Sequence, residues 1–155
     1  MVGQSYSRWY PILRLELKVN PYQDVKEFHE ATGLTVKEKL DLYPTMTDLR
    51  LRAKLHREEY RELQEGINLL IDAEDDGEAY SALVEIADGI ADLIYVVAGT
   101  AVTLGIPLEN VWAEVQRSNM SKIGPDGVKR RDDGKILKPD TFSPALIEPI
   151  LNNAR

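Results

Sequence analysis

Two groups of acidic residues at helical spacing are the residues of this sequence whose types could do chemistry. The groups are Glu58, Glu59 and Glu62, and then Glu85, Asp88 and Asp92. At about 100° per residue of an α-helix, the second group falls within roughly 60° of one helix face. Carboxylates held this close repel one another, and burying one without a partner costs several kcal/mol. We therefore expect a positive charge opposite them.

The second acidic group lies in a segment that reads as a mostly buried helix. Apolar residues fall on nearly every face between Leu83 and Leu104, which is typical of a helix covered on most sides. Antiparallel packing against a helix that carries the first group would bring both groups to one place. Four to six carboxylates around one cavity suit a hard divalent cation. The alternative for the first group is a solvated face paired with Arg57 and Arg61.

Composition narrows the chemistry further. The 155 residues contain no cysteine and two histidines, His29 and His56, which excludes a thiolate zinc site and argues against a His-rich one. We expect both histidines to be packing or surface residues and not metal ligands. The net charge of −7 argues against a nucleic-acid binder, and the apolar run 93–106 is shorter than the roughly 20 residues of a membrane span. The N-terminus lacks the pattern of a signal peptide, so the cytoplasm is the expected location.

Charge is unevenly distributed along the chain. Acids dominate from Glu58 to Asp92, whereas the segment from Arg117 to Lys138 is rich in lysine and arginine. Such a chain could bind a metal ion with its acidic part and a phosphate with its basic part.

The elements that must position these residues are predicted to be helices. Cap and periodicity signals predict helices over 24–32, 47–72 with Thr47 as N-cap, 78–104, 108–118 and 144–151, with a connector over 34–45. The predicted fold is all-α: two long antiparallel helices, shorter helices around them, and a basic C-terminal loop. Residues 1–20 are an arm of uncertain structure that could include a strand, and residues 21–155 form a single domain.

The acidic pattern resembles that of a known superfamily. Glu58-Glu59-x-x-Glu62 followed by Glu85-Ile-Ala-Asp88-Gly-Ile-Ala-Asp92-Leu-Ile-Tyr95 is similar to the all-α NTP pyrophosphohydrolases. These are the MazG-like enzymes, related to phosphoribosyl-ATP pyrophosphohydrolase and to dimeric dUTPases. The segments 27–33, 104–107, 111–122 and 133–139 also fit, so the resemblance covers roughly residues 24–150.

The resemblance implies a magnesium site, where Mn²⁺ can replace Mg²⁺. Glu59 and Glu62 match the ligands of the first long helix, Glu58 matches an acid near the catalytic water, and Asp92 matches the last aspartate. Gly89 stands where the family has a glutamate. Two solutions stay open: Asp88 with Asp92 as ligands and Glu85 behind them or on a second ion, or a core of Glu85 and Asp88 assisted by Asp92. We favour the first.

The resemblance also implies the reaction and its partners. The expected function is hydrolysis of an NTP or dNTP, with dUTP a candidate, at the α-phosphate to give a monophosphate and pyrophosphate. Asn119, Lys122 and Lys138 would contact the substrate, although both lysines could be plain surface cations. Tyr95 could stack on the base, but a core role suits it better.

Members of that superfamily assemble as dimers or tetramers, and for this chain we predict a homodimer. The apolar stretch 95–102 exceeds what one small monomer easily covers. Two alternative functions remain. One is phosphoribosyl-ATP pyrophosphohydrolase, but the closer similarity of the segment 119–138 to the dUTPase-like branch argues against it. The other is a non-catalytic helical dimerisation or regulatory module.

Overall fold

A computed structural model describes residues 19–155, which form five helices and no strand, so the predicted all-α fold is confirmed. The strand or arm predicted for residues 1–20 lies almost wholly outside the described residues. The helices are α1 (Pro21–Thr32), α2 (Met46–Ile71), α3 (Asp76–Leu104), α4 (Leu108–Met120) and α5 (Ile147–Asn153).

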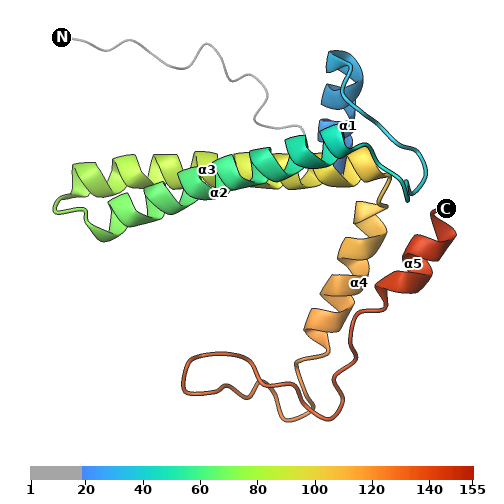
Figure 1. The fold of residues 1–155 in the computed structure, drawn as a ribbon. Helices are drawn as coiled ribbons and strands as arrows, with labels where there is room; N and C mark the ends of the chain where they lie inside the picture. Colours follow the sequence, from blue (N-terminus) through green and yellow to red (C-terminus); the bar gives the residue numbers. More distant parts are fainter. Residues whose placement is uncertain (1–18) are drawn as a thin grey trace, which may run out of the picture.

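The two longest helices, α2 and α3, form an antiparallel hairpin, and α1 packs against α3 at the open end of that hairpin (Figure 1). The chain bends by 119° between α3 and α4, so α4 runs away from the hairpin. A long loop follows α4, and α5 then returns beside α4. The hairpin and the C-terminal loop are therefore separate parts of one chain.

Side-chain caps set the helix starts, and here three predictions were wrong. Asn20, not Asp24, caps α1 by accepting a hydrogen bond from Gln23 N. Thr45, not Thr47, caps α2, because its position allows the side chain to reach the free amide of the third helical residue. Asp75 caps α3, which therefore begins before Glu78.

The predicted C-terminal ends of the helices are correct where a glycine follows the helix and less accurate at the other helices. Gly33 and Gly105 follow α1 and α3 with φ values of 74° and 65°, the left-handed backbone that favours glycine. The helix α4 runs two residues past the predicted Ser118, and α5 covers 147–153 instead of 144–151. The connector over 34–45 is confirmed.

The most buried apolar side chains join α1 to the C-terminal half of α3. Val25, Ala98 and Val102 form this core, against which the partly buried Tyr22, Val36 and Leu108 pack. The predicted apolar stretch 95–102 is thus covered in part within the monomer, because Ala98, Ala101 and Val102 are buried.

A buried polar pair completes this junction. The Arg52 guanidinium lies 3.4 Å from His29 Nε2, and burial lowers the pKa of Arg52. His29 Nδ1 lies 3.0 Å from the carbonyl oxygen of Thr35. A carbonyl can only accept and a guanidinium can only donate, so Nδ1 carries the proton and Nε2 accepts. Gly99 leaves room for the guanidinium, since a Cβ there would lie 2.5 Å from Arg52 Nη1.

The second histidine also serves the fold. His56 Nε2 lies 2.7 Å from Thr100 Oγ1 and 3.3 Å from the carbonyl oxygen of Val96, across the α2–α3 contact. Both histidines therefore make structural hydrogen bonds, as their predicted packing role requires.

Two glycines bring α2 and α3 into close contact. A Cβ on Gly66 would lie 3.2 Å from the backbone nitrogen of Ile86, and a Cβ on Gly89 would lie 3.1 Å from Leu63 Cα. Neighbouring backbone atoms cannot move aside as a flexible side chain can. These two contacts therefore fix how far α2 slides along α3, which decides which acidic residues meet.

Replacing Gly89 by alanine should destabilise the hairpin. Alanine in a helix normally stabilises by up to about 1 kcal/mol relative to glycine, but overpacking against backbone costs roughly 1–3 kcal/mol. We expect a net loss of up to about 2 kcal/mol in the free energy of unfolding, measured by urea denaturation.

The matched control for this change is Gly77→Ala in the first turn of α3. There the added methyl group meets a side-chain oxygen of Asp75 at 3.1 Å rather than backbone. A stability of Gly89→Ala at or above that of the unsubstituted protein would contradict the close contact.

Candidate functional site

The α2–α3 register places the acidic residues of one helix opposite those of the other. Partial burial raises the pKa of Glu59 above its ordinary value, and nearby carboxylates raise it further. In decreasing order of effect, these carboxylates belong to Glu62, Asp92, Glu58 and Asp88. Glu85 is not among the groups that act on Glu59, and it lies two helical turns from Asp92 toward the α2–α3 turn. Of the six predicted acids, Glu62, Asp92, Glu58 and Asp88 thus lie near enough to affect Glu59, and Glu85 does not.

Few cations balance these charges. Lys54 Nζ lies 3.5 Å from a Glu58 oxygen, and Arg61 Nε lies 3.5 Å from a Glu65 oxygen. Within residues 19–155, no ion pair reaches Glu59, Glu62, Asp88 or Asp92. The pairing with Arg57 and Arg61 that the solvated alternative expects is therefore absent from the described residues, although Glu62 itself is exposed to solvent.

The donor set suits magnesium in its chemistry, because it consists of carboxylate oxygens from two facing helices. In the part of the chain that the structure describes, however, no three Asp, Glu or His side chains converge closely enough to hold one ion. Asp88 and Asp92 are exposed, as is Glu62, and Glu59 is half-buried. Their side chains must therefore turn toward one another before they can share a cation.

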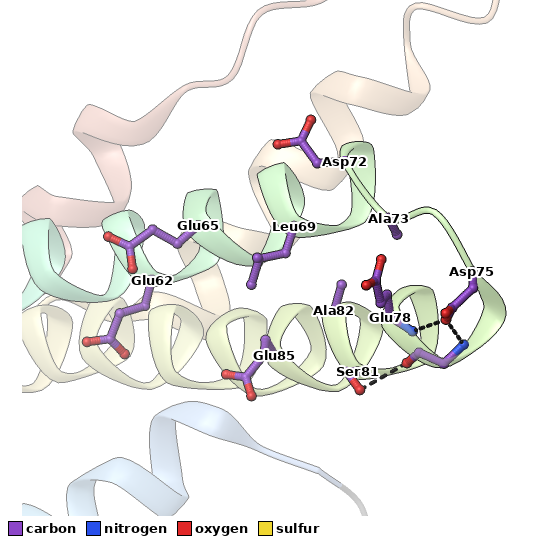
Figure 2. A pocket seen from close by; sticks show the side chains of 12 residues that line it. Glu62, Glu65, Leu69, Asp72, Ala73, Asp75, Glu78, Ser81, Ala82 and Glu85 are labelled. Atoms are coloured by element: carbon purple, nitrogen blue, oxygen red, sulfur yellow. Dashed lines mark hydrogen bonds between the residues drawn. The ribbon is translucent and has the colours of Figure 1, made fainter.

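An open acidic groove continues from this cluster to the α2–α3 turn (Figure 2). The groove has a volume of about 1020 Å³. Its lining carboxylates belong to Glu62, Glu65, Asp72, Asp75, Glu78 and Glu85. Glu62 and Glu65 come from α2 and Glu78 and Glu85 from α3, so acidic side chains lie on both sides. The sequence predicted a single cavity. The structure instead has a cluster of acids around Glu59 and a groove that continues from this cluster at Glu62.

Tyr95 lies at the contact between α1 and α3. Its ring meets Phe28 edge-on with 5.8 Å between centroids, and 38% of the residue remains exposed. Tyr95 thus makes an aromatic contact, but it is not the core residue that the sequence favoured, because its side chain stays exposed.

The basic residues predicted to bind substrate lie in another part of the chain. Asn119 lies in the last turn of α4, and Lys122 and Lys138 belong to the loop that lies at the end of α4 away from the hairpin (Figure 1). Lys122 Nζ donates to Asn119 Oδ1 over 2.8 Å. Lys122, Lys129 and Lys138 line a pocket of about 420 Å³ formed by the loop itself. Within one chain, the structure brings these residues to one another but not to the acids.

An unpredicted pair on α4 ties down the end of this loop. Arg117 donates through Nε and Nη2 to the Glu114 carboxylate at 2.8 Å, and through Nη1 and Nη2 to Ser143 Oγ and the Pro144 carbonyl at 3.0 Å. The Leu146 amide donates to Glu114 at 2.8 Å. The spacing of three between Glu114 and Arg117 was a visible signal for the pair, but nothing marked its partners more than 25 residues away.

The same contacts shift the acidity of Glu114. Hydrogen bonds from Arg117, and then from the Leu146 amide, lower the pKa of Glu114 from 4.5 to about 2. Ionised Glu114 is therefore part of what holds the C-terminal segment to α4.

Comparison with known proteins agrees with this arrangement. The phosphoribosyl-ATP pyrophosphohydrolase family model matches residues 25–119. The matched range contains α2, α3 and both acidic groups, and it covers more than half of the chain. The chain belongs to the phosphoribosyl-ATP pyrophosphohydrolase family. The predicted membership of the all-α NTP pyrophosphohydrolase superfamily is thereby confirmed.

Membership of this family makes the protein a pyrophosphohydrolase. No curated protein matches the chain. The family match ends at Asn119, so the lysine-bearing loop lies beyond it. No helix within residues 19–155 is by itself both long and apolar enough to cross a membrane, and α3 and α4 meet these two criteria only as a pair that is bent by 119°.

The Glu114 contacts make the thermal stability of the pyrophosphohydrolase depend on pH in a defined direction. Because the folded pKa lies below the ordinary value, this stabilisation is complete above about pH 4.5 and is lost as the pH falls through about 2. The melting temperature of Glu114→Gln should therefore be lower than that of the unsubstituted protein at neutral pH, and the difference should vanish toward pH 2.

Thermal unfolding of both proteins across this pH range would measure the difference. Glu148→Gln on α5 removes one carboxylate from the same segment and controls for the change in charge. An unchanged difference down to pH 2 would show that the Glu114 carboxylate is not what holds the segment.

Proposed function

We propose that this pyrophosphohydrolase is a magnesium-dependent enzyme that converts a nucleoside or deoxynucleoside triphosphate into its monophosphate and pyrophosphate. The observation that carries the proposal is the gathering of acids from α2 and α3 around Glu59 in a chain of this family. The cytoplasm, predicted from the sequence, is the proposed location.

Four carboxylates would hold the Mg²⁺ ion, or Mn²⁺ in its place: Glu59, Glu62, Asp88 and Asp92. Asp88 fills the gap left at Gly89, because the Leu63 backbone leaves no room for a side chain there. Asp88 is also one of the charges that raise the pKa of Glu59, whereas Glu85 is not. These facts support a position for Glu85 outside the four ligands, on the side where it lines the groove, with a role behind them or on a second ion.

The chemistry follows from the positions of these residues. A bound Mg²⁺ would offset the negative charge of the triphosphate oxygens. Glu58, with a side chain 37% exposed, would orient a water toward the α-phosphorus and take its proton. The water oxygen bonds to the α-phosphorus, the bond from that phosphorus to the bridging oxygen breaks, and pyrophosphate leaves with the bonding electrons.

The substrate contacts call for a second copy of the chain. Asn119, Lys122 and Lys138 would bind phosphate or sugar, and Tyr95 would be available to the base. Because the loop lies away from the hairpin within one chain, we propose that a homo-oligomer, a dimer or tetramer, brings it to the acids of a neighbour.

The apolar surface of α3 supports such assembly. Leu83, Ile90, Ile94 and Val97 are spaced by three, four or seven residues and are each 46–52% exposed. They form one stripe along the helix that the monomer leaves uncovered.

Ile94→Glu should disrupt this assembly by placing a charge within the stripe. Light scattering should show an oligomer for the unsubstituted protein and a smaller species for the variant, with loss of pyrophosphate release. Asn152→Glu on the exposed face of α5 is the control for an added charge. A monomeric unsubstituted protein with full activity would contradict the proposed assembly.

Phosphoribosyl-ATP is the second candidate substrate, favoured by the family that the chain matches. The family match ends at Asn119, and the loop with Lys122 and Lys138 lies beyond it, which argues against phosphoribosyl-ATP as the substrate. Pyrophosphate release from all common NTPs and dNTPs and from phosphoribosyl-ATP, each with and without Mg²⁺, would decide between them. Release from none of these would favour the non-catalytic module instead.

Glu59→Gln should abolish Mg²⁺-dependent pyrophosphate release, lowering kcat/KM by about a hundredfold or more. The substitution removes a charged ligand and keeps the size of the side chain. Glu65→Gln is the matched control, since it removes an exposed glutamate of the same helix that pairs with Arg61. Full turnover in Glu59→Gln would show that the ligand assignment is wrong.

A further inference from the structure

The loop over 122–142 is held at both ends by the last turns of α4. Its entry follows directly from Ser121, whose hydroxyl donates to the Ser118 carbonyl over 2.7 Å. Its exit is Ser143, whose amide donates to that same Ser121 oxygen over 2.9 Å. Arg117 Nη1 donates to the Ser143 hydroxyl from the other side. Ser143 is thus fixed by both its backbone and its side chain.

Lys138 is connected to this anchor through its neighbours. Its ammonium group lies 4.4 Å from the centre of the Phe142 ring, a cation–π contact. The Phe142 amide donates to the Pro139 carbonyl over 2.9 Å, which closes a tight turn between the two side chains. Phe142 directly precedes Ser143. A continuous series of contacts therefore leads from Arg117 through Ser143 and Phe142 to Lys138.

Glu114 makes the Arg117 end of this series rigid. Its carboxylate receives two parallel hydrogen bonds from the guanidinium, a geometry that fixes the plane of the group. With Glu114 on one edge, the remaining donors point at Ser143 and Pro144. Lys122 is placed differently, because it follows α4 directly and donates to Asn119 within that helix.

We propose that Arg117, held by Glu114, is a positioning residue that places Lys138 for contact with the substrate phosphates by anchoring the exit of the loop. This proposal rests on the proposed function, which makes Lys138 a phosphate contact. Arg117 itself does not touch the substrate, and Lys122 keeps its place without it.

A double-mutant cycle separates this role from a general structural one. Binding of inorganic pyrophosphate in the presence of Mg²⁺ is measured by calorimetry for the full chain. Arg117→Ala should weaken binding about tenfold or more, because the exit of the loop loses its charge-assisted hydrogen bonds at Ser143 and Pro144 and Lys138 is no longer held in place. Arg117→Ala combined with Lys138→Ala should bind no more weakly than Lys138→Ala alone, whereas its effect should add to that of Lys122→Ala.

Turnover gives a second readout. Arg117→Ala should raise KM by about tenfold and leave kcat nearly unchanged, because the acids around Glu59 are not altered. Arg117→Lys keeps the positive charge but replaces the planar guanidinium, with its several donor nitrogens, by a single ammonium group. Its KM should therefore be raised about as much as that of the alanine variant. Phe142→Leu and Ser143→Ala each remove one contact of the series and keep the pair on α4, and they replace Arg117→Ala if that variant does not fold. Lys26→Ala on α1, which breaks an ion pair with Glu38, is the control.

The outcomes separate the two proposals. Independent effects of Arg117 and Lys138, a near-normal KM in Arg117→Lys, or no pyrophosphate binding by the unsubstituted protein would each overturn the positioning role. Coupled binding effects in a protein that hydrolyses no nucleotide would support the positioning role and refute the proposed function. Mg²⁺-dependent hydrolysis together with independent effects of Arg117 and Lys138 would support the proposed function and refute the positioning role.

Discussion

The close approach of α2 to α3 at two glycines is the constraint on which the rest of the structure depends. Gly66 lies against Ile86 and Gly89 lies against Leu63, each within reach of backbone atoms, so the two helices have one register. That register sets the acids of one helix opposite those of the other. A residue with a side chain at either position would change the distance between the helices, and the electrostatic surroundings of every carboxylate between them would change with it.

The acids and the apolar core lie at different places along α3. Partial burial, and then the charges of Glu62, Asp92, Glu58 and Asp88, hold the pKa of Glu59 above its usual value. The apolar core joins α1 to the C-terminal half of α3, around Val25, Ala98 and Val102. The most buried apolar packing and the acidic cluster are thus separated along α3.

The sequence predicted what depends on local rules. Helix type, the glycine stops at Gly33 and Gly105, and the opposed acidic groups all follow from spacing and from backbone preference. The helix starts were missed because several residues near each start can act as a cap, and only the chain path shows which one does. The reason for glycine at position 89 needs the neighbouring helix, and the distance of the basic loop from the acids needs the bend after α3.

The C-terminal loop is tied to α4 at Ser121 and Ser143, and α5 then meets the connector where the Leu40 amide donates to the Ala154 carbonyl. None of these attachments involves the acidic faces of the hairpin. Insertions, deletions and substitutions between the two anchors can therefore accumulate without disturbing the acidic helices. A chain built this way can change the length and sequence of this loop during evolution while α2 and α3 are inherited unchanged.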